Sequence, residues 1–130
     1  MAIKGIRKAI AFCIVASIAV IGSLANAEPS NKWRIVFNHS TDADGEVVFR
    51  ISPLNGTPVE VATKIPKGTG ENHAAQLVKK SLKASLGEGY HVEVDDFETV
   101  VIKKAGKTPD FDLTLASSTV SGLSIDLKRL

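Results

Sequence analysis

Apolar residues recur at every second position through most of the sequence between residues 28 and 130, and this alternation constrains the fold more than any other feature. A β-strand turns successive side chains to opposite faces, so an alternating segment predicts a strand with one buried and one solvated face. The turn-forming pairs Asp44-Gly45 and Asn55-Gly56 separate the first three such segments. We therefore expect antiparallel pairing of consecutive strands, over residues 33–37, 47–51, 59–65, 90–94, 100–102, 111–115 and 123–127.

One segment in the middle of the chain changes to the period of a helix. Apolar residues there recur every four positions and predict a helix over about residues 71–86, with a buried ridge made of Ala74, Val78, Leu82 and Leu86. Thr69 is the expected N-cap, and Glu71 places negative charge at the positive end of the helix dipole. Gly87 is expected to end the helix.

After the helix, the alternation predicts a hairpin. A turn through residues 95–97 would place Val92 and Val94 on the same face as Val100 and Ile102. Together these elements predict an α+β domain over residues 28–130, in which an antiparallel sheet of about six or seven strands is covered by one helix. Because one helix cannot cover so many strands, we expect the sheet to curl into a partial barrel.

The N-terminus has the pattern of a secretory signal peptide. Three basic residues, Lys4, Arg7 and Lys8, precede an uncharged apolar run over residues 9–24. The run ends in the sequence Ala25-Asn26-Ala27, in which small residues occupy the two positions that signal peptidase recognises. We therefore predict residues 1–27 to be removed by cleavage after Ala27; the alternative is an uncleaved membrane anchor. The expected location is the periplasm of a Gram-negative bacterium or the medium outside it.

Removal of the signal would change the charge of the protein. The full chain has 16 basic and 14 acidic residues, and the signal holds three of the basic ones, which leaves 13 basic against 14 acidic. A net charge near zero gives no overall attraction to nucleic acid or to anionic lipid. Cys13 also lies in the signal and is the only cysteine, so the remaining chain has neither a disulfide nor a thiol nucleophile.

A candidate metal site lies on the strand after the helix. His91, Glu93 and Asp95 are spaced two apart, so an extended strand would present all three on one face. Imidazole and carboxylate groups at this spacing could bind zinc or another divalent ion. The alternative, which we prefer, is the solvated face of an amphipathic hairpin.

A second acidic segment resembles part of a calcium-binding loop. Asp42 and Asp44 occupy the third and fifth positions of a loop that begins at Ser40, with glycine at the sixth. The twelfth position, where the loop needs a glutamate, is Ile51. We therefore interpret Asp42 and Asp44 as a structural turn.

Signatures of catalysis are missing from the sequence. It contains no Gly-x-Ser-x-Gly elbow, no His-Glu-x-x-His pair and no complete glycine-rich phosphate loop. Asp110 and Asp112 alternate with apolar residues, which indicates the solvated face of a strand rather than an acid/base pair. We therefore expect no enzymatic activity and no cofactor.

These features favour a small exported, non-enzymatic binding or protein-interaction module. Its partner would be a protein of the cell envelope or outside the cell, contacted through a sheet face or by pairing at a strand edge. The sequence leaves two alternatives open. One is an inhibitor of an exported or host hydrolase that uses the loop 103–109 or the loop 52–58 as a plug, and the other is a metal-dependent enzyme centred on His91.

Overall fold

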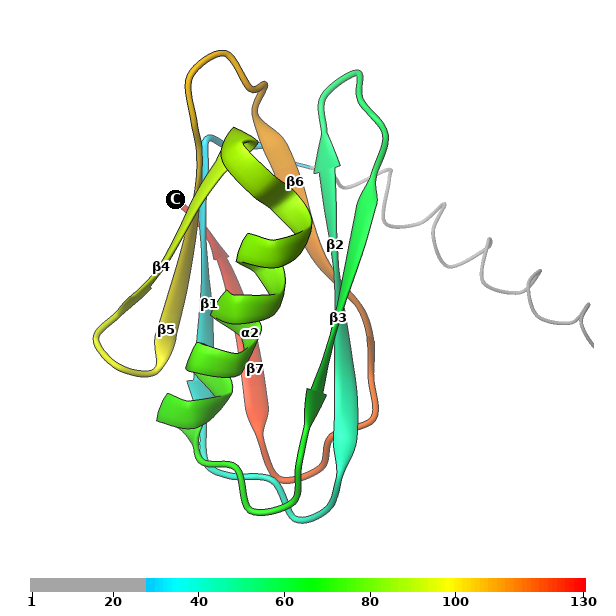
Figure 1. Ribbon diagram of the computed structural model, residues 1–130, viewed down its shortest axis with the longest axis vertical. Helices are drawn as coiled ribbons and strands as arrows, with labels where there is room; N and C mark the ends of the chain where they lie inside the picture. Colours follow the sequence, from blue (N-terminus) through cyan, green and yellow to red (C-terminus); the bar gives the residue numbers. More distant parts are fainter. Residues whose placement is uncertain (1–27) are drawn as a thin grey trace, which may run out of the picture.

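The computed structural model describes residues 28–130, so the predicted signal with Ala25 and Ala27 lies outside the described residues. Antiparallel strands and one long helix make up this part of the chain, which confirms the α+β prediction (Figure 1). The elements in chain order are β1 (Lys32–Asn38), β2 (Gly45–Pro53), β3 (Val59–Ile65), α2 (Glu71–Leu86), a short 3-10 helix (Gly87–Gly89), β4 (Tyr90–Asp95), β5 (Thr99–Lys104), β6 (Phe111–Ser118) and β7 (Ser124–Arg129).

The strands divide between two sheets, in place of the single curled sheet that we expected. One sheet has the order β4-β5-β1-β7 and the other the order β3-β2-β6. Helix α2 packs against β3 and β4, one edge strand from each sheet, and so covers the side of the molecule between them (Figure 1). The strand edges that α2 leaves uncovered are those of β6 and β7.

Consecutive pairing is correct for only part of the chain. The hairpins β2–β3 and β4–β5 form as predicted, but β1 pairs with β5 and β7 instead of β2. The connection 39–44 crosses from one sheet to the other. It is held by hydrogen bonds from the Thr41 amide to the Thr69 carbonyl (3.0 Å) and from the Asp42 amide to the Ser121 carbonyl (2.9 Å). Alternation determines which face of a strand is buried but does not determine its neighbour.

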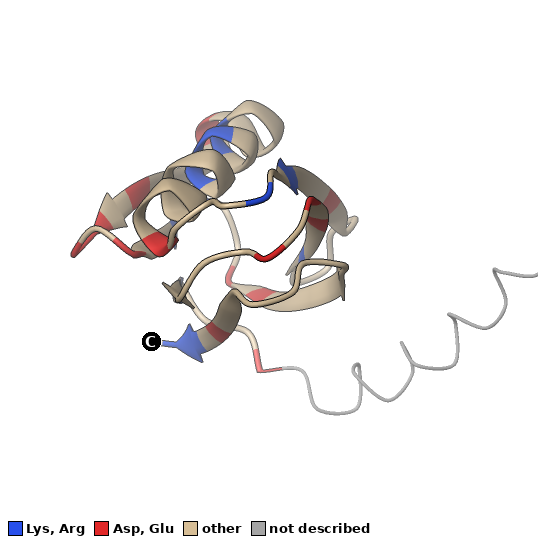
Figure 2. Ribbon diagram, turned by 90° about the horizontal axis from the view of Figure 1, so that it is seen from below, with Lys and Arg blue, Asp and Glu red and all other residues tan. Residues whose placement is uncertain are grey.

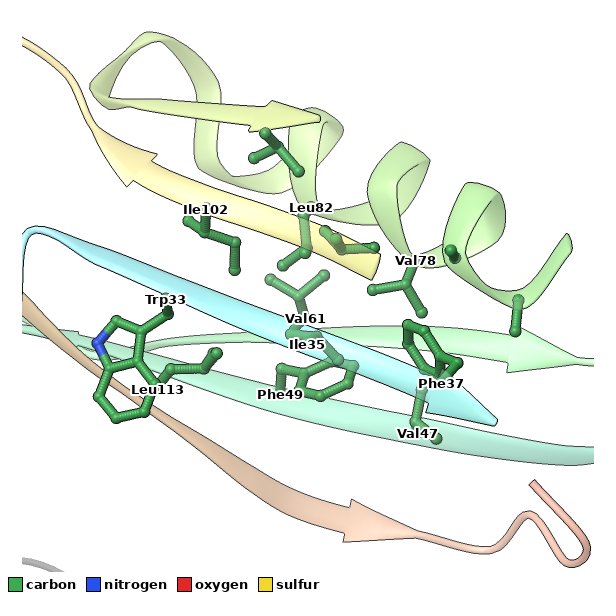
Figure 3. Close-up of a cluster of buried hydrophobic side chains, with 14 of the residues drawn as sticks. Trp33, Ile35, Phe37, Val47, Phe49, Val61, Val78, Leu82, Ile102 and Leu113 are labelled. Carbon is green, nitrogen blue, oxygen red and sulfur yellow. The ribbon is translucent and has the colours of Figure 1, made fainter. Parts of the chain in front are cut away.

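The core lies between the two sheets and under the helix. Figure 3 shows Ile35 of β1 beside Phe49 of β2 and Phe37 of β1 over Val47 of β2, with Val78 and Leu82 above them. The buried cluster comprises Trp33, Ile35, Phe37, Val47, Phe49, Ile51, Val61, Ile65, Ala74, Ala75, Val78, Leu82, Val92, Val100, Ile102, Phe111, Leu113 and Leu123. Trp33 also donates a hydrogen bond from Nε1 to the Phe111 carbonyl (2.8 Å), which satisfies its buried polar atom and joins the two sheets.

The helix has the predicted bounds but a different N-cap residue. Gly70 is the N-cap and makes no side-chain cap hydrogen bond, so the prediction of Thr69 is wrong. The Thr69 hydroxyl instead donates to the Pro66 carbonyl (2.6 Å), and Glu71 Oε1 accepts a hydrogen bond from the His39 amide (2.8 Å). Within residues 28–130, no helix has both the length and the apolar character needed to cross a membrane.

Candidate functional site

The β4–β5 hairpin projects from the edge of the four-stranded sheet beside the N-terminal half of α2 (Figure 1). Val94 lies opposite Val100, so the predicted shared face is confirmed, but the turn falls one residue later than the predicted 95–97. The last pair, Asp95 with Thr99, leaves residues 96–98 to make the turn. At this tip Phe97 is 75% exposed, more than any other large apolar residue in the described part of the chain.

The backbone of this tip is strained. Asp96 has φ 52° and Phe97 has φ 61°, which places both in the left-handed region. Asp tolerates this region, but for a bulky residue such as Phe it costs about 1–2 kcal/mol. Because the ring is exposed, its burial contributes little to the stability of the fold and does not offset this cost. Such strain concentrates at binding and active sites, so Phe97 is the first residue that we assign to a candidate site.

A groove of about 820 Å³ separates the tip from the helix. One wall is the first half of α2 and the other is the end of β4 with its turn. The lining residues are Asn72, His73, Gln76, Lys79, Glu93, Val94, Asp96 and Phe97. The groove therefore combines one exposed aromatic ring with polar and charged groups that surround it on both sides.

The two walls of the groove differ in charge. Lys79 stands on the helix, whereas Glu93 and Asp96 stand on the hairpin. Figure 2 shows acidic residues gathered along the hairpin and lysines on the neighbouring helix. None of the lining residues is a Ser, Thr, Cys or Tyr, so the groove itself supplies no hydroxyl or thiol nucleophile. Its chemistry suits recognition through an apolar anchor and paired charges.

The candidate metal residues do share a face, as the alternation predicted. His91, Glu93 and Asp95 are all exposed along β4, while Val92 between them is buried. Across residues 28–130, however, no three His, Cys, Asp or Glu side chains come close enough together to hold a metal ion. Of the three, only Glu93 lines the groove.

The acidic segment before β2 ties two loops together. Asp44 Oδ1 accepts a hydrogen bond from the Lys67 amide (2.8 Å), which engages the side chain in the turn before α2. The Asp42 amide is bonded to the Ser121 carbonyl, and the Asp42 carboxylate lies against Gly122. Through these contacts the segment of Asp42 and Asp44 is joined to the loop before α2 and to the loop before β7.

The two loops suggested for an inhibitor lie together at the end of the molecule away from Phe97 (Figure 1). The Leu54 amide donates a hydrogen bond to the Asp110 carbonyl (2.9 Å), and Lys104 Nζ lies 3.2 Å from Asp110 Oδ1. Leu54 is 47% exposed and is followed by Asn55 with φ 59°. This end therefore presents a second exposed apolar side chain on a turn that hydrogen bonds hold in place.

Sequence reasoning placed the turn at residues 95–97 but did not identify Phe97 as a site residue. A signal was present, because Asp96 and Phe97 occupy positions where hairpins prefer Asn and Gly. An aromatic residue in a hairpin turn, flanked by the acidic residues Asp95, Asp96 and Glu98, is expected to face solvent. The groove could not be predicted, because its two walls come from elements that pack together only in the tertiary fold.

Comparison with models of known protein families finds no match for this chain, and a search of curated proteins finds no similar sequence.

Proposed function

We propose that this protein is an exported, non-enzymatic protein-binding module that engages its partner through Phe97 and the adjoining groove. The observation that carries the proposal is the exposed aromatic ring held at a positive φ. A ring at a strained turn adds little to stability but makes a rigid, protruding anchor. Aromatic residues of this kind supply most of the binding energy in protein interfaces.

The charges around Phe97 define the partner's chemistry. Asp95, Asp96 and Glu98 flank the ring on the tip of the hairpin. A complementary partner has an apolar socket for the ring and Lys or Arg residues around the socket. Lys79, on the far wall of the groove, favours an acidic or carbonyl group at the partner's edge.

Affinity measurements on two matched variants test the proposal. Wild-type protein captures its partner from an envelope extract, and the purified partner is then titrated against F97A and L54A. We expect F97A to weaken binding by roughly 30-fold or more, the loss typical of a central anchor residue. L54A removes another exposed large apolar side chain, at the opposite end of the molecule, and should leave the affinity unchanged. Equal affinities for F97A and wild type would refute the proposed surface.

A second candidate function is inhibition of an exported or host hydrolase by the opposite end of the molecule. It is supported by the hydrogen bond between the Leu54 amide and the Asp110 carbonyl, which joins the loop 52–58 to the residue that follows the loop 103–109. A rigid loop with an exposed apolar tip suits insertion into an enzyme's substrate cleft. In an assay of substrate breakdown by a lytic enzyme, the wild type and F97A would then protect the substrate, and L54A would not.

The proposed location is the periplasm or the medium, and its support is the N-terminal pattern that ends at Ala27. Mass spectrometry of the protein recovered from fractions of its own host tests it. A chain that begins at Glu28 in the periplasmic or secreted fraction would support export with cleavage. A chain that retains residues 1–27 in the membrane fraction would indicate the uncleaved anchor instead.

A further inference from the structure

The solvent-facing side of α2 carries a second groove, next to the one beside Phe97. This second groove has a volume of about 570 Å³ and is lined by His73, Gln76, Leu77, Lys79, Lys80 and Lys83. Three of these residues, His73, Gln76 and Lys79, also line the groove beside Phe97. The two grooves therefore adjoin on one side of the molecule, and we call the second one the lysine groove.

The lysine groove has the chemistry of a socket for an aromatic ring. Leu77 is only partly buried and lies outside the core cluster, so its side chain is an apolar surface at the groove. The aliphatic stems of the lysines extend that apolar surface, while their ammonium groups stay in water. An ammonium group near the face of a ring is attracted to it by about 0.5–1 kcal/mol at exposed sites. These are the properties that the proposed function requires of the surface that receives Phe97.

The hairpin tip and the lysine groove carry opposite charges that the chain itself does not pair. The acidic residues of the tip are Asp95, Asp96 and Glu98, and the lysines of the groove are Lys79, Lys80 and Lys83. Within residues 28–130 the ion pairs, Arg50 with Glu60 and Lys104 with Asp110, involve none of these six side chains. The tip of one molecule is therefore complementary in charge to the lysine groove of another.

We propose that a second copy of this chain is the partner, with Phe97 of each copy seated in the lysine groove of the other. The inference rests on the proposed function, because it takes Phe97 as a protein-binding anchor and names what the anchor binds. The hairpin tip and the lysine groove both lie at α2 (Figure 1). A two-fold axis between two facing helices therefore exchanges both tips at once, and each contact occurs twice in a closed dimer.

The direction of α2 fits this exchange. Phe97 lies beside the first half of its own helix, where the shared groove reaches Asn72, whereas Lys80 and Lys83 belong to the second half. Two helices related by a perpendicular two-fold axis run antiparallel, so the first half of each faces the second half of the other. The tip of one copy then meets Lys80 and Lys83 of the second copy, and these lysines face the acids that flank the ring.

Sedimentation equilibrium on the purified chain that begins at Glu28, which contains the whole core, tests the dimer. At low salt the wild type should show a monomer–dimer equilibrium, and added salt should weaken it because the paired charges are exposed. F97A removes two rings from each dimer, so its association constant should fall by the square of a 30-fold loss, roughly 1,000-fold. L54A should dimerise like the wild type.

Charge reversal on the two sides of the contact gives a sharper test. K80E/K83E gives the groove the charge of the tip, and D95K/E98K gives the tip the charge of the groove; neither variant alters a residue with positive φ. Each variant alone should be monomeric, because like charges then meet at both contacts. An equal mixture of the two should form a 1:1 heterodimer, in which both contacts again join opposite charges.

The control is K103E/K107E, which makes the same change of charge on two exposed lysines away from α2 and should dimerise like the wild type. A wild type that stays monomeric at low salt would overturn the inference. A dimer that F97A leaves intact, or a mixture of the two charge-reversed variants that stays monomeric, would overturn it equally. Failure of the proposed function is distinguishable, because the titration above uses a captured protein. K80E/K83E keeps Phe97 and its acidic neighbours and can take part in that titration.

Discussion

The strain at Phe97 can be measured by comparing two truncations of the same side chain. F97A and F97G both remove the ring, so they lose the same contacts and differ only in the methyl group. At φ 61° an alanine has the steric penalty of the left-handed region, about 1–2 kcal/mol, which glycine avoids. Glycine in turn loses about 0.4–1 kcal/mol through the greater entropy of the unfolded chain. The midpoints of these two ranges differ by about 0.8 kcal/mol, so we expect F97G to be more stable than F97A by about 0.5–1 kcal/mol.

Urea or thermal unfolding monitored by circular dichroism measures this difference. For a domain of this size it corresponds to a shift in Tm of about 2–8 °C. Glu98 supplies the control, because it is the next residue and its φ is not positive. E98A should be more stable than E98G, the order usual for ordinary backbone. If F97A proves as stable as F97G, or more stable, the turn does not hold Phe97 at a positive φ and the assignment of strain is wrong.

The remaining predictions concern the core, the acidic turn and pH. L82A should lower the free energy of unfolding by about 2–5 kcal/mol, because it opens a cavity under the helix. K83A, on the exposed face of the same helix, should change the free energy of unfolding little, and chemical denaturation of both variants measures the difference. D44A should cost about 1 kcal/mol by removing the acceptor of the Lys67 amide, and added calcium should not shift the Tm of the wild type. Burial raises the pKa of Asp112 on β6, so the folded state binds this proton more tightly than the unfolded state does. Stability measured against pH should therefore fall as the pH rises from the ordinary Asp value through the raised one, and D112N should remove that slope.

Local periodicity was sufficient to locate the elements. The helix spans the predicted residues because its apolar ridge and Gly87 are both local signals. The alternating segments became strands for the same reason, and Ile35, Phe49 and Ile102 are buried as the pattern predicts. The hairpin and the shared face of Val94 and Val100 were also predictable, because a short turn leaves few ways to align two strands, although the turn lies at 96–98 instead of 95–97.

The sequence alone determined the α+β class, the bounds of the helix and the inward face of most strand segments, because these depend on residues close together in the chain. Val59 and Leu115, which the alternation assigns to apolar faces, are exposed. Only the tertiary structure decided that β1 lies between β5 and β7 and that the strands form two sheets. It also decided that Thr69 bonds to Pro66 instead of capping the helix, and that Phe97 faces a groove beside α2. Each of these depends on which distant segments meet, and periodicity within one segment carries no information about that choice.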